Sequence, residues 1–441
     1  MLGTVSTSDQ GIPAEEKDYY LAKGYSLNDR VGLSYLEKEY EEYLHGEKAE
    51  YEIVNSHETK LIKEGKRGKD IVLTIDINLQ REVERILSEQ IRNAKGEANT
   101  DFYDHSSVVI QDPKTGEILA MASKKIVNGK IVDNTTSILI SPITPGSVVK
   151  GASMLVGYNT GAIHIGETML DECVKVKGVA KKCSSVDNLG VINDITALAK
   201  SSNVYQFKTA IRVNGQEYYY DMPLIFKQKS FDTYRNMYHS FGLGVKTEID
   251  LPNESLGYKG KSRLSGLLLD FSIGQYDTYS ALQLSSYVNT LANLGERNKL
   301  HIVKEVRYST DDNSIGAIKS SVDKELLNTS DIDKIYFERV REGFVSVMEG
   351  YLGRGYMGNS PSPAGKTGTS ESFYDSDGDG KVDEETYSKS FIGYAPYDNP
   401  VMSIVSISPH ISHKKSTSSY TSNVNKRIVS RICNIFFENY K

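Results

Sequence analysis

The apolar positions along the chain predict strands at both ends of a large region and helices between them. β-Branched residues over 71–75 predict a strand, and Asp76 is placed to cap a helix over 79–92, where apolar residues recur at helical spacing. A section from about 147 to 348 is rich in helical patterns, and a last one covers 423–437. Further strands are predicted at 106–110, 117–123, 365–371, 388–394 and 401–407. This order predicts an α/β (α+β layered) domain whose sheet is completed by C-terminal strands.

The first 68 residues follow a different pattern. They are highly charged and rich in Tyr, with a helical stretch over 29–44. They end in the basic segment Lys63-Glu-Gly-Lys-Arg-Gly-Lys69, whose glycines are typical of a linker. We therefore predict a small accessory domain over 1–68 and a larger domain over 69–441, which a chain of 441 residues is long enough to form.

Composition narrows the classes of partner and the compartment. The net charge of −6 argues against a general attraction to nucleic acid or anionic lipid. No run of about 18 apolar residues occurs, and the first residues do not resemble a signal peptide. This predicts either a cytosolic protein or one whose membrane anchor lies outside these residues. Three cysteines are too few for a disulfide framework, although Cys173 and Cys183 could pair across a hairpin or remain free thiols.

The segment Thr144-Pro-Gly-Ser-Val-Val-Lys150 carries the main chemical signal. A Pro-Gly pair followed by an apolar run predicts that Ser147 begins a helix, which places Lys150 one turn away on the same face. A serine hydroxyl needs a base within hydrogen-bond reach to act as a nucleophile, and a desolvated lysine can be that base. A helix start also offers backbone donors to a developing negative charge. Ser147 is thus the predicted nucleophile and Lys150 the predicted base.

The Ser-x-x-Lys pattern alone is weak, because it recurs at Ser321/Lys324 and Ser412/Lys415. Two later motifs single out the first copy. Ser201-Ser202-Asn203 and Lys366-Thr367-Gly368-Thr369 follow it in order, and the three motifs together are the set shared by penicillin-binding proteins and class A β-lactamases. Other partial copies, Ser26-Leu-Asn28 and Lys114-Thr-Gly116, precede Ser147 and so do not fit the order.

Each later motif has a chemical role to offer. Ser201 and Asn203, predicted on a loop between helices, can relay a proton to a leaving amine and hold a substrate amide; taken alone they would be helix caps. The strand with Lys366, Thr367, Gly368 and Thr369 offers a positive charge and hydroxyl donors to a terminal carboxylate. Backbone N–H groups of Ser147 and Thr369 would form an oxyanion hole.

The whole chain resembles the class B penicillin-binding proteins, the monofunctional peptidoglycan D,D-transpeptidases. The accessory region, with Tyr25-Ser-Leu-Asn-Asp-Arg-Val-Gly32, resembles their non-catalytic pedestal. Leu73-Thr-Ile-Asp-Ile-Asn-Leu-Gln80 resembles the start of their transpeptidase domain. Further matching segments are Leu36–Glu41, Asp112–Leu119, Phe241–Gly244, Asp250–Pro252, Ile273–Gln275 and Tyr394–Pro400. The N-terminal sequence is most similar to those of the Gram-positive elongation-type enzymes.

The resemblance implies a function and a location. The substrate would be a stem peptide ending in D-Ala-D-Ala, whose penultimate carbonyl Ser147 attacks; an amine of a neighbouring stem peptide then resolves the acyl-enzyme. β-Lactams would acylate the same serine, and no cofactor would take part in catalysis. The family faces the outside of the cell on an N-terminal anchor, which would lie outside these residues, and a membrane glycosyltransferase is the expected partner.

An acidic segment departs from the family pattern. Asp375-Ser-Asp-Gly-Asp-Gly-Lys-Val-Asp383 fits the first half of an EF-hand loop, but Thr386 stands where the bidentate Glu should be. It resembles the nine-residue calcium loops carried on β-hairpins. We predict a structural calcium ion, or otherwise a solvated acidic hairpin tip. The ligands would be the carboxylates of Asp375, Asp377, Asp379 and Asp383 and the carbonyl of Lys381.

Two rival functions remain open. A serine β-lactamase shares the three motifs but needs a second base for its hydrolytic water, and Glu325-Leu-Leu-Asn328, which reads as a solvated helix, is an unconvincing source. A non-enzymatic penicillin sensor would be acylated at Ser147 only to signal, but it would lack a pedestal. Acylation at Ser147 is therefore the better-founded prediction, and transpeptidation rests mostly on the resemblance.

Overall fold

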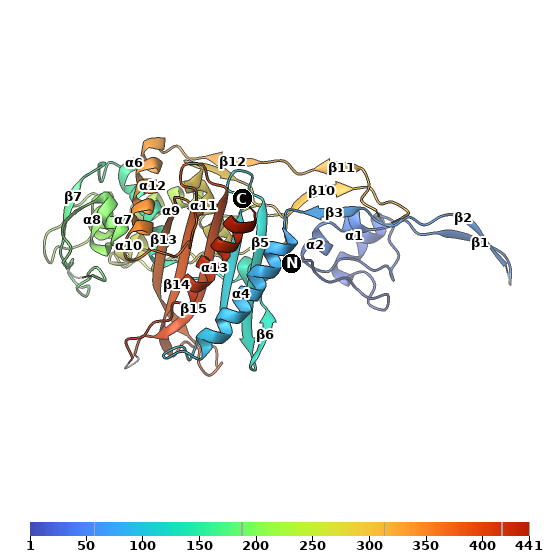
Figure 1. The fold of residues 1–441 in the computed structure, drawn as a ribbon, viewed down its shortest axis with the longest axis horizontal. Helices are drawn as coiled ribbons and strands as arrows, with labels where there is room; N and C mark the ends of the chain where they lie inside the picture. The colour runs from blue at the N-terminus through green and yellow to red at the C-terminus, as the bar shows by residue number, and fades with distance from the viewer. Residues whose placement is uncertain (57, 187, 313, 416–417, 441) are drawn as a thin grey trace. The chain divides into compact units, whose positions relative to one another are not determined.

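The computed structural model describes residues 1–56, 58–186, 188–312, 314–415 and 418–440, which form two compact units (Figure 1). Unit 1 comprises Met1–Thr74, Glu248–Glu254 and Leu300–Lys324. Unit 2 comprises Ile75–Thr247, Ser255–Lys299 and Glu325–Lys441. The predicted accessory region therefore lies in unit 1, which also takes in two later segments that no sequence pattern placed there.

Unit 1 has short helices, a hairpin and a three-stranded sheet. The helices are η1 (Ala14–Glu16), α1 (Lys17–Ala22), α2 (Tyr35–Glu39) and α3 (Glu41–Leu44). The hairpin is β1 (Glu50–Asn55) with β2 (Glu58–Lys63), and the sheet has the order β11 (Ile318–Ser321), β10 (Val303–Arg307), β3 (Asp70–Leu73). The helix predicted over 29–44 is wrong at its start, because the backbone at Val31 and Leu33 instead pairs with Ser6 and Thr4.

One six-stranded antiparallel sheet organises unit 2. Its order is β13 (Ala364–Tyr374), β14 (Glu384–Ala395), β15 (Met402–His413), β4 (His105–Gln111), β5 (Ile118–Val127), β6 (Lys130–Asp133). Strands from the two ends of the chain meet where β15 pairs with β4, with Ile404 opposite Ile110. The predicted layered fold, with C-terminal strands completing the sheet, is confirmed.

Helices cover both faces of this sheet. On one face lie α4 (Ile77–Lys95) and α13 (Val424–Asn439), which run side by side in Figure 1 and share a core with Ile110 and Ile404. The Asp76 side chain caps α4 as predicted, accepting hydrogen bonds from two backbone N–H groups. Since adjacent strand residues point to opposite faces, Ser403, which hydrogen-bonds Asn289 of α11 (Ala281–Ala292) at 2.6 Å, places α11 on the other face.

The remaining helices lie between these strands in the sequence, and all but the first lie in the section from about 147 to 348 that is predicted to be helix-rich. They are α5 (Ser137–Ile140), η2 (Gly146–Val149), α6 (Lys150–Asn159), α7 (Asp194–Ala199), α8 (Asn203–Val213), α9 (Gln228–Ser240), α10 (Leu267–Ser272) and α12 (Lys334–Glu349). Two small sheets interrupt them: β7 (Thr168–Asp171) with β8 (Gly190–Asn193), and β9 (Glu296–Asn298) with β12 (Leu326–Thr329). The helix predicted for Glu325–Asn328 is wrong, because this segment leads into strand β12, which pairs with β9.

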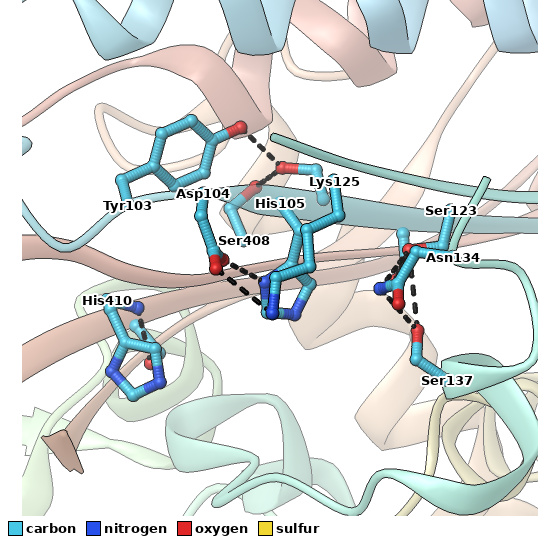
Figure 2. Close-up of polar contacts among 12 residues, drawn as sticks. Tyr103, Asp104, His105, Ser123, Lys125, Asn134, Ser137, Ser408 and His410 are labelled. Atoms are coloured by element: carbon cyan, nitrogen blue, oxygen red, sulfur yellow. Dashed lines mark hydrogen bonds and ion pairs between the residues drawn. The ribbon is translucent and has the colours of Figure 1, made fainter. Parts of the chain in front are cut away.

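Polar side chains also tie the strands of the large sheet together (Figure 2). Tyr103 hydrogen-bonds Ser106 of β4 at 2.8 Å, and Ser106 hydrogen-bonds Ser408 of β15 at 2.7 Å. Asp104 forms an ion pair with Lys125 of β5 at 3.2 Å. None of the predicted site residues belongs to this cluster.

The described residues answer the question of cysteine pairing that composition left open. Cys173 and Cys183 form a disulfide, whereas Cys433 is a buried free thiol in α13. No helix in the described ranges is long and apolar enough to cross a membrane.

Candidate active site

Ser147 lies in the 3₁₀ turn η2, directly before α6, and is half-buried. Gly146 supplies the conformation that this turn needs, with a φ of +63°. Its N–H donates to the carbonyl of Gly274 at 2.9 Å, and a Cβ at this position would lie 2.5 Å from the carbonyl oxygen of Thr369. The close approach brings Ser147 beside the Lys366–Thr369 segment, so the first and third motifs meet.

Lys150 is the first residue of α6 and is fully buried. Its Nζ donates to the carbonyl oxygen of Ser201 at 2.7 Å, to Ser201 Oγ at 3.2 Å and to Asn203 Oδ1 at 2.7 Å. Within the described part of the chain no hydrogen bond joins Lys150 to Ser147. The two residues are nevertheless one turn apart, as predicted, and the second motif lies against the first.

Ser201 and Asn203 lie where α7 ends and α8 begins, as the sequence predicts. Ser201 adopts a φ of +53°, in the left-handed region that is costly for a residue with a side chain. Ser202 caps α8, because its Oγ accepts a hydrogen bond from the N–H of Tyr205 at 2.9 Å. Ser202 thus makes the helix cap, and Ser201 Oγ and Asn203 Oδ1 instead accept hydrogen bonds from Lys150 Nζ.

Lys366 brings the third motif to the same place. It is fully buried on β13, and its Nζ donates to Ser201 Oγ at 2.9 Å and to the Thr367 carbonyl oxygen at 3.0 Å. Ser201 Oγ therefore contacts both lysines. Thr367 is half-buried and Thr369 exposed, and β13 ends the sheet with one edge not paired to another strand of the described chain.

Gly368 lets the strand approach the serine turn. A Cβ at Gly368 would lie 2.2 Å from Ser390 Oγ and 2.9 Å from the Pro145 carbonyl oxygen. Ser390 Oγ already donates to that carbonyl at 2.7 Å, so β14 and η2 are joined directly at this point. A side chain at Gly368 would push β13 away from Ser147.

Burial changes the acid–base chemistry of both lysines. Burial lowers the pKa of Lys150 well below its usual value, and the neighbouring positive charge of Lys366 lowers it further, whereas Asp171 opposes the change. Burial lowers the pKa of Lys366 to about 7. A lysine whose pKa is lowered gives up its own proton more readily, and its neutral amine can accept a proton from a serine hydroxyl, which is what a nucleophilic Ser147 requires.

The acidic segment forms the tip of the β13–β14 hairpin. Oxygen atoms of Asp375, Asp377 and Asp379 lie within 4.8 Å of one another, which suits a hard divalent cation. Asp383 instead accepts hydrogen bonds from the N–H of Ser376 at 2.9 Å and from its Oγ. Three of the five predicted ligands are therefore gathered, and the calcium site stays a prediction.

The other copies of the motifs do not share this environment. Ser321 is exposed in β11 and Ser412 lies in β15, so neither begins a helix. Lys114 lies in a turn closed by a hydrogen bond from the N–H of Gly116 to the Asp112 carbonyl at 3.0 Å. The order of the motifs thus selected the copies that the structure brings together.

Sequence reasoning missed two residues of this region, Asp171 and Ser184. Asp171 is a buried carboxylate whose Oδ2 accepts hydrogen bonds from Ser184 Oγ at 3.0 Å and from Ser202 Oγ. Neither residue belongs to a motif. The spacing of Cys173 and Cys183, which lie between Asp171 and Ser184 in the sequence, was the one available signal that these two residues are held near each other.

Comparison with known proteins identifies two family domains in this chain. The family model of the penicillin-binding protein transpeptidase domain matches residues 106–434, and that of the penicillin-binding protein dimerisation domain matches residues 1–73. Penicillin-binding protein 2A of Bacillus subtilis is 46% identical over 93% of this chain. The chain spans 58% of that relative's length.

Solved structures show the same likeness. Penicillin-binding protein 2B of Streptococcus pneumoniae strain R6 matches with a TM-score of 0.88 and 31% identity, covering 100% of this chain and 72% of that one. Penicillin binding protein 3 of Mycobacterium tuberculosis, complexed with aztreonam, shares the fold, with a TM-score of 0.65 at 23% identity over 93% of this chain and 86% of that one. The chain belongs to the class B penicillin-binding proteins, with the dimerisation domain followed by the transpeptidase domain.

Proposed function

We propose that this chain is a peptidoglycan D,D-transpeptidase with Ser147 as its nucleophile. One observation carries the proposal: two fully buried lysines from distant segments, Lys150 and Lys366, both contact Ser201 beside the turn that holds Ser147. Burying two cationic side chains together is costly for stability, and such costs are typical of sites that need shifted pKa values.

The residues divide the acylation step between them. Neutral Lys150 takes the proton of Ser147 Oγ as the oxygen bonds to the penultimate carbonyl carbon of the stem peptide. The N–H groups of Ser147 and Thr369 stabilise the oxyanion. The C–N bond then breaks, and the proton reaches the departing D-Ala amine through Ser201, which contacts Lys150.

Substrate binding falls to the other residues. Charged Lys366 and the hydroxyls of Thr367 and Thr369 would hold the terminal carboxylate, while Asn203 would hold the substrate amide and the free edge of β13 its backbone. An amine of a second stem peptide next attacks the acyl-enzyme carbonyl, restoring Ser147 and forming the crosslink. No cofactor takes part in these steps.

The relatives support the substrate and the inhibitor. A protein of Escherichia coli that is 24% identical over 92% of this chain is named as a peptidoglycan D,D-transpeptidase, and the Mycobacterium tuberculosis relative binds aztreonam. β-Lactams would therefore acylate Ser147. The enzyme would act at the outer face of the membrane, on an anchor outside these residues, beside a membrane glycosyltransferase. The elongation-type role stays a prediction.

Crosslinking of synthetic stem peptides tests the proposal. The wild type is expected to join a D-Ala-D-Ala donor to an acceptor amine, and Ser147→Ala is expected to abolish the product. Ser321→Ala is the matched control, because Ser321 begins the same four-residue pattern in an exposed strand. Rapid hydrolysis of penicillin without crosslinking would instead indicate a β-lactamase, and a stable adduct without crosslinking would indicate a sensor.

We also propose that the hairpin tip binds calcium as a structural ion. The three gathered carboxylates of Asp375, Asp377 and Asp379 support it. The loop also bends so that Asp375 accepts hydrogen bonds from the N–H groups of Gly378 and Gly380, both at 2.8 Å. An ion there would stiffen the far end of β13 and take no part in acyl transfer.

A further inference from the structure

A buried carboxylate stands behind the turn that carries Ser201 and Asn203. Asp171, the last residue of β7, is 3% exposed. Its Oδ2 accepts hydrogen bonds from Ser184 Oγ at 3.0 Å and from Ser202 Oγ. A buried carboxylate is costly unless hydrogen bonds satisfy it, so the two hydroxyl protons are directed to Asp171.

The two hydroxyls then act as acceptors for the start of α8. Ser184 Oγ accepts hydrogen bonds from the N–H groups of Asn203 at 3.1 Å and Val204 at 3.2 Å, while Ser202 Oγ accepts from Tyr205 at 2.9 Å. These N–H groups belong to the first turn of the helix and have no partner inside it. Asp171 thereby fixes the backbone position of Asn203 through Ser184 and Ser202.

The disulfide closes the loop that lies between Asp171 and Ser184 in the sequence. Cys173 and Cys183 join its two arms, and Val174 and Lys182 exchange backbone hydrogen bonds of 2.8 and 2.9 Å. The Cys183 carbonyl accepts a hydrogen bond from Asn203 Nδ2 at 3.2 Å. Because the amide nitrogen of Asn203 is directed there, its Oδ1 is directed to Lys150 Nζ, at 2.7 Å.

We propose that Asp171 and Ser184 are positioning residues for acyl transfer, and that the Cys173–Cys183 disulfide makes the reaction sensitive to reduction. Neither residue touches the reacting atoms. They act through Asn203 and the Ser201 turn, which in turn hold Lys150. The inference rests on the proposed function, because it concerns the rate at which Ser147 is acylated.

Asp171 also gives the proposal a signature in the pH profile. Burial and Lys366 lower the pKa of Lys150, and Asp171 alone among the groups acting on it raises it. Replacing Asp171 by Asn removes that negative charge and lowers the pKa of Lys150 further. The base then loses its proton at a lower pH, so the acidic limb of the acylation profile moves to lower pH. Damage to packing alone would reduce the rate without moving the limb.

Acylation by a fluorescent penicillin, followed against pH, tests these roles in the full chain. Asp171→Asn and Ser184→Ala are expected to slow acylation by about tenfold or more, within the range that small misplacements of catalytic groups produce. Ser185→Ala is the matched control, since Ser185 is the exposed neighbour of Ser184, and its rate should stay within about twofold of the wild type.

Reduction of the disulfide provides a second test, which does not depend on substitutions at buried positions. Dithiothreitol, oxidised to its cyclic disulfide as Cys173 and Cys183 become thiols, is expected to slow the wild type about threefold. A Cys173→Ser/Cys183→Ser variant should match the reduced wild type and not respond to dithiothreitol. The third cysteine, Cys433, is buried and remains in both proteins.

The outcomes separate this inference from the proposed function. A wild type that penicillin does not acylate at Ser147 would overturn the proposed function itself. Acylation of the wild type with rates within twofold for Asp171→Asn, Ser184→Ala and the reduced protein would overturn the positioning roles alone. If Asp171→Asn does not fold, as judged from its melting curve, Ser184→Ala and the reductant decide the question.

Discussion

The two ends of strand β13 hold charged residues in opposite environments. At its start, Lys366 is fully buried, and burial lowers its pKa to about 7. Just past its other end, Asp377 and Asp379 are exposed at the hairpin tip. Lys366 on the strand therefore has a shifted pKa, whereas the charges of Asp377 and Asp379, just beyond the strand, are screened by water.

The two environments also explain where motif-based prediction is informative. Near Lys366 the site contains Lys150 and Ser201 from distant segments, so three independent motifs constrain one another. At the tip, the acidic residues come from one short stretch, and their carboxylates accept hydrogen bonds from nearby backbone N–H groups. The buried end should therefore control chemistry, and the exposed end at most local stability.

The largest effect is expected from removing the base at the buried end. Lys150→Ala should lower the rate of penicillin acylation by about 10³-fold, because general-base catalysis contributes about 10²- to 10⁴-fold. Lys415→Ala, in the copy of the pattern at Ser412, is the control and should leave the rate unchanged. Stopped-flow measurement of adduct formation checks both. A Lys150→Ala variant near the wild-type rate would assign the base elsewhere.

The pH profile of acylation is the next test. The second-order rate constant reports the free enzyme, in which Lys366 loses its proton as the pH rises through its lowered pKa of about 7. The positive partner of the ligand carboxylate is lost at the same time, so the rate should fall above pH 7. On the acidic side the rate should fall as Lys150 becomes protonated. A rate that keeps rising to pH 9 would contradict a charged Lys366 in ligand binding.

Gly146→Ala tests the close approach between the serine turn and β13. The new Cβ would lie 2.5 Å from the Thr369 carbonyl oxygen, on a residue with a positive φ. We expect a loss of about 2–4 kcal/mol of stability and slower acylation.

Gly161→Ala is the control for this substitution. Gly161 also has a positive φ, of +70°, but nothing lies within 4 Å of its added Cβ. It should cost only about 1–2 kcal/mol, with no effect on acylation. Thermal unfolding and acylation rates are the measurements, and equal effects at the two glycines would argue against a functional contact.

The smallest effect is expected at the exposed tip. Millimolar calcium should raise the melting temperature by a few degrees, since an ion that binds only the folded state stabilises it by mass action. Asp377→Asn should remove the response, whereas Asp398→Asn, at an exposed carboxylate in another turn, should keep it. Acylation rates should not change. A melting temperature that does not respond to calcium would contradict the calcium site and indicate that the tip is a solvated acidic hairpin.

The sequence predicted five of the six strands of the large sheet, all but β6, and the two helices α4 and α13 on one of its faces, because each has a local signature. The motifs likewise named the residues that the structure brings together at the candidate site. Apolar periodicity marked α4 and α13, and motif order selected Ser147 over Ser321. The hydrogen bonds of Lys150 could not be predicted, since they depend on where segments 51 and 53 residues away are packed. Asp171 and Ser184 were missed for the same reason, and the later segments of unit 1 carry no pattern of their own.

Formation of the acyl-enzyme on Ser147 is best tested by intact mass spectrometry with benzylpenicillin, followed by peptide mapping of the adduct. We expect one adduct of the mass of the penicillin, on the peptide containing Ser147, and none in Ser147→Ala. An adduct on Ser201, Ser321 or Ser412, or an adduct that persists in Ser147→Ala, would contradict it.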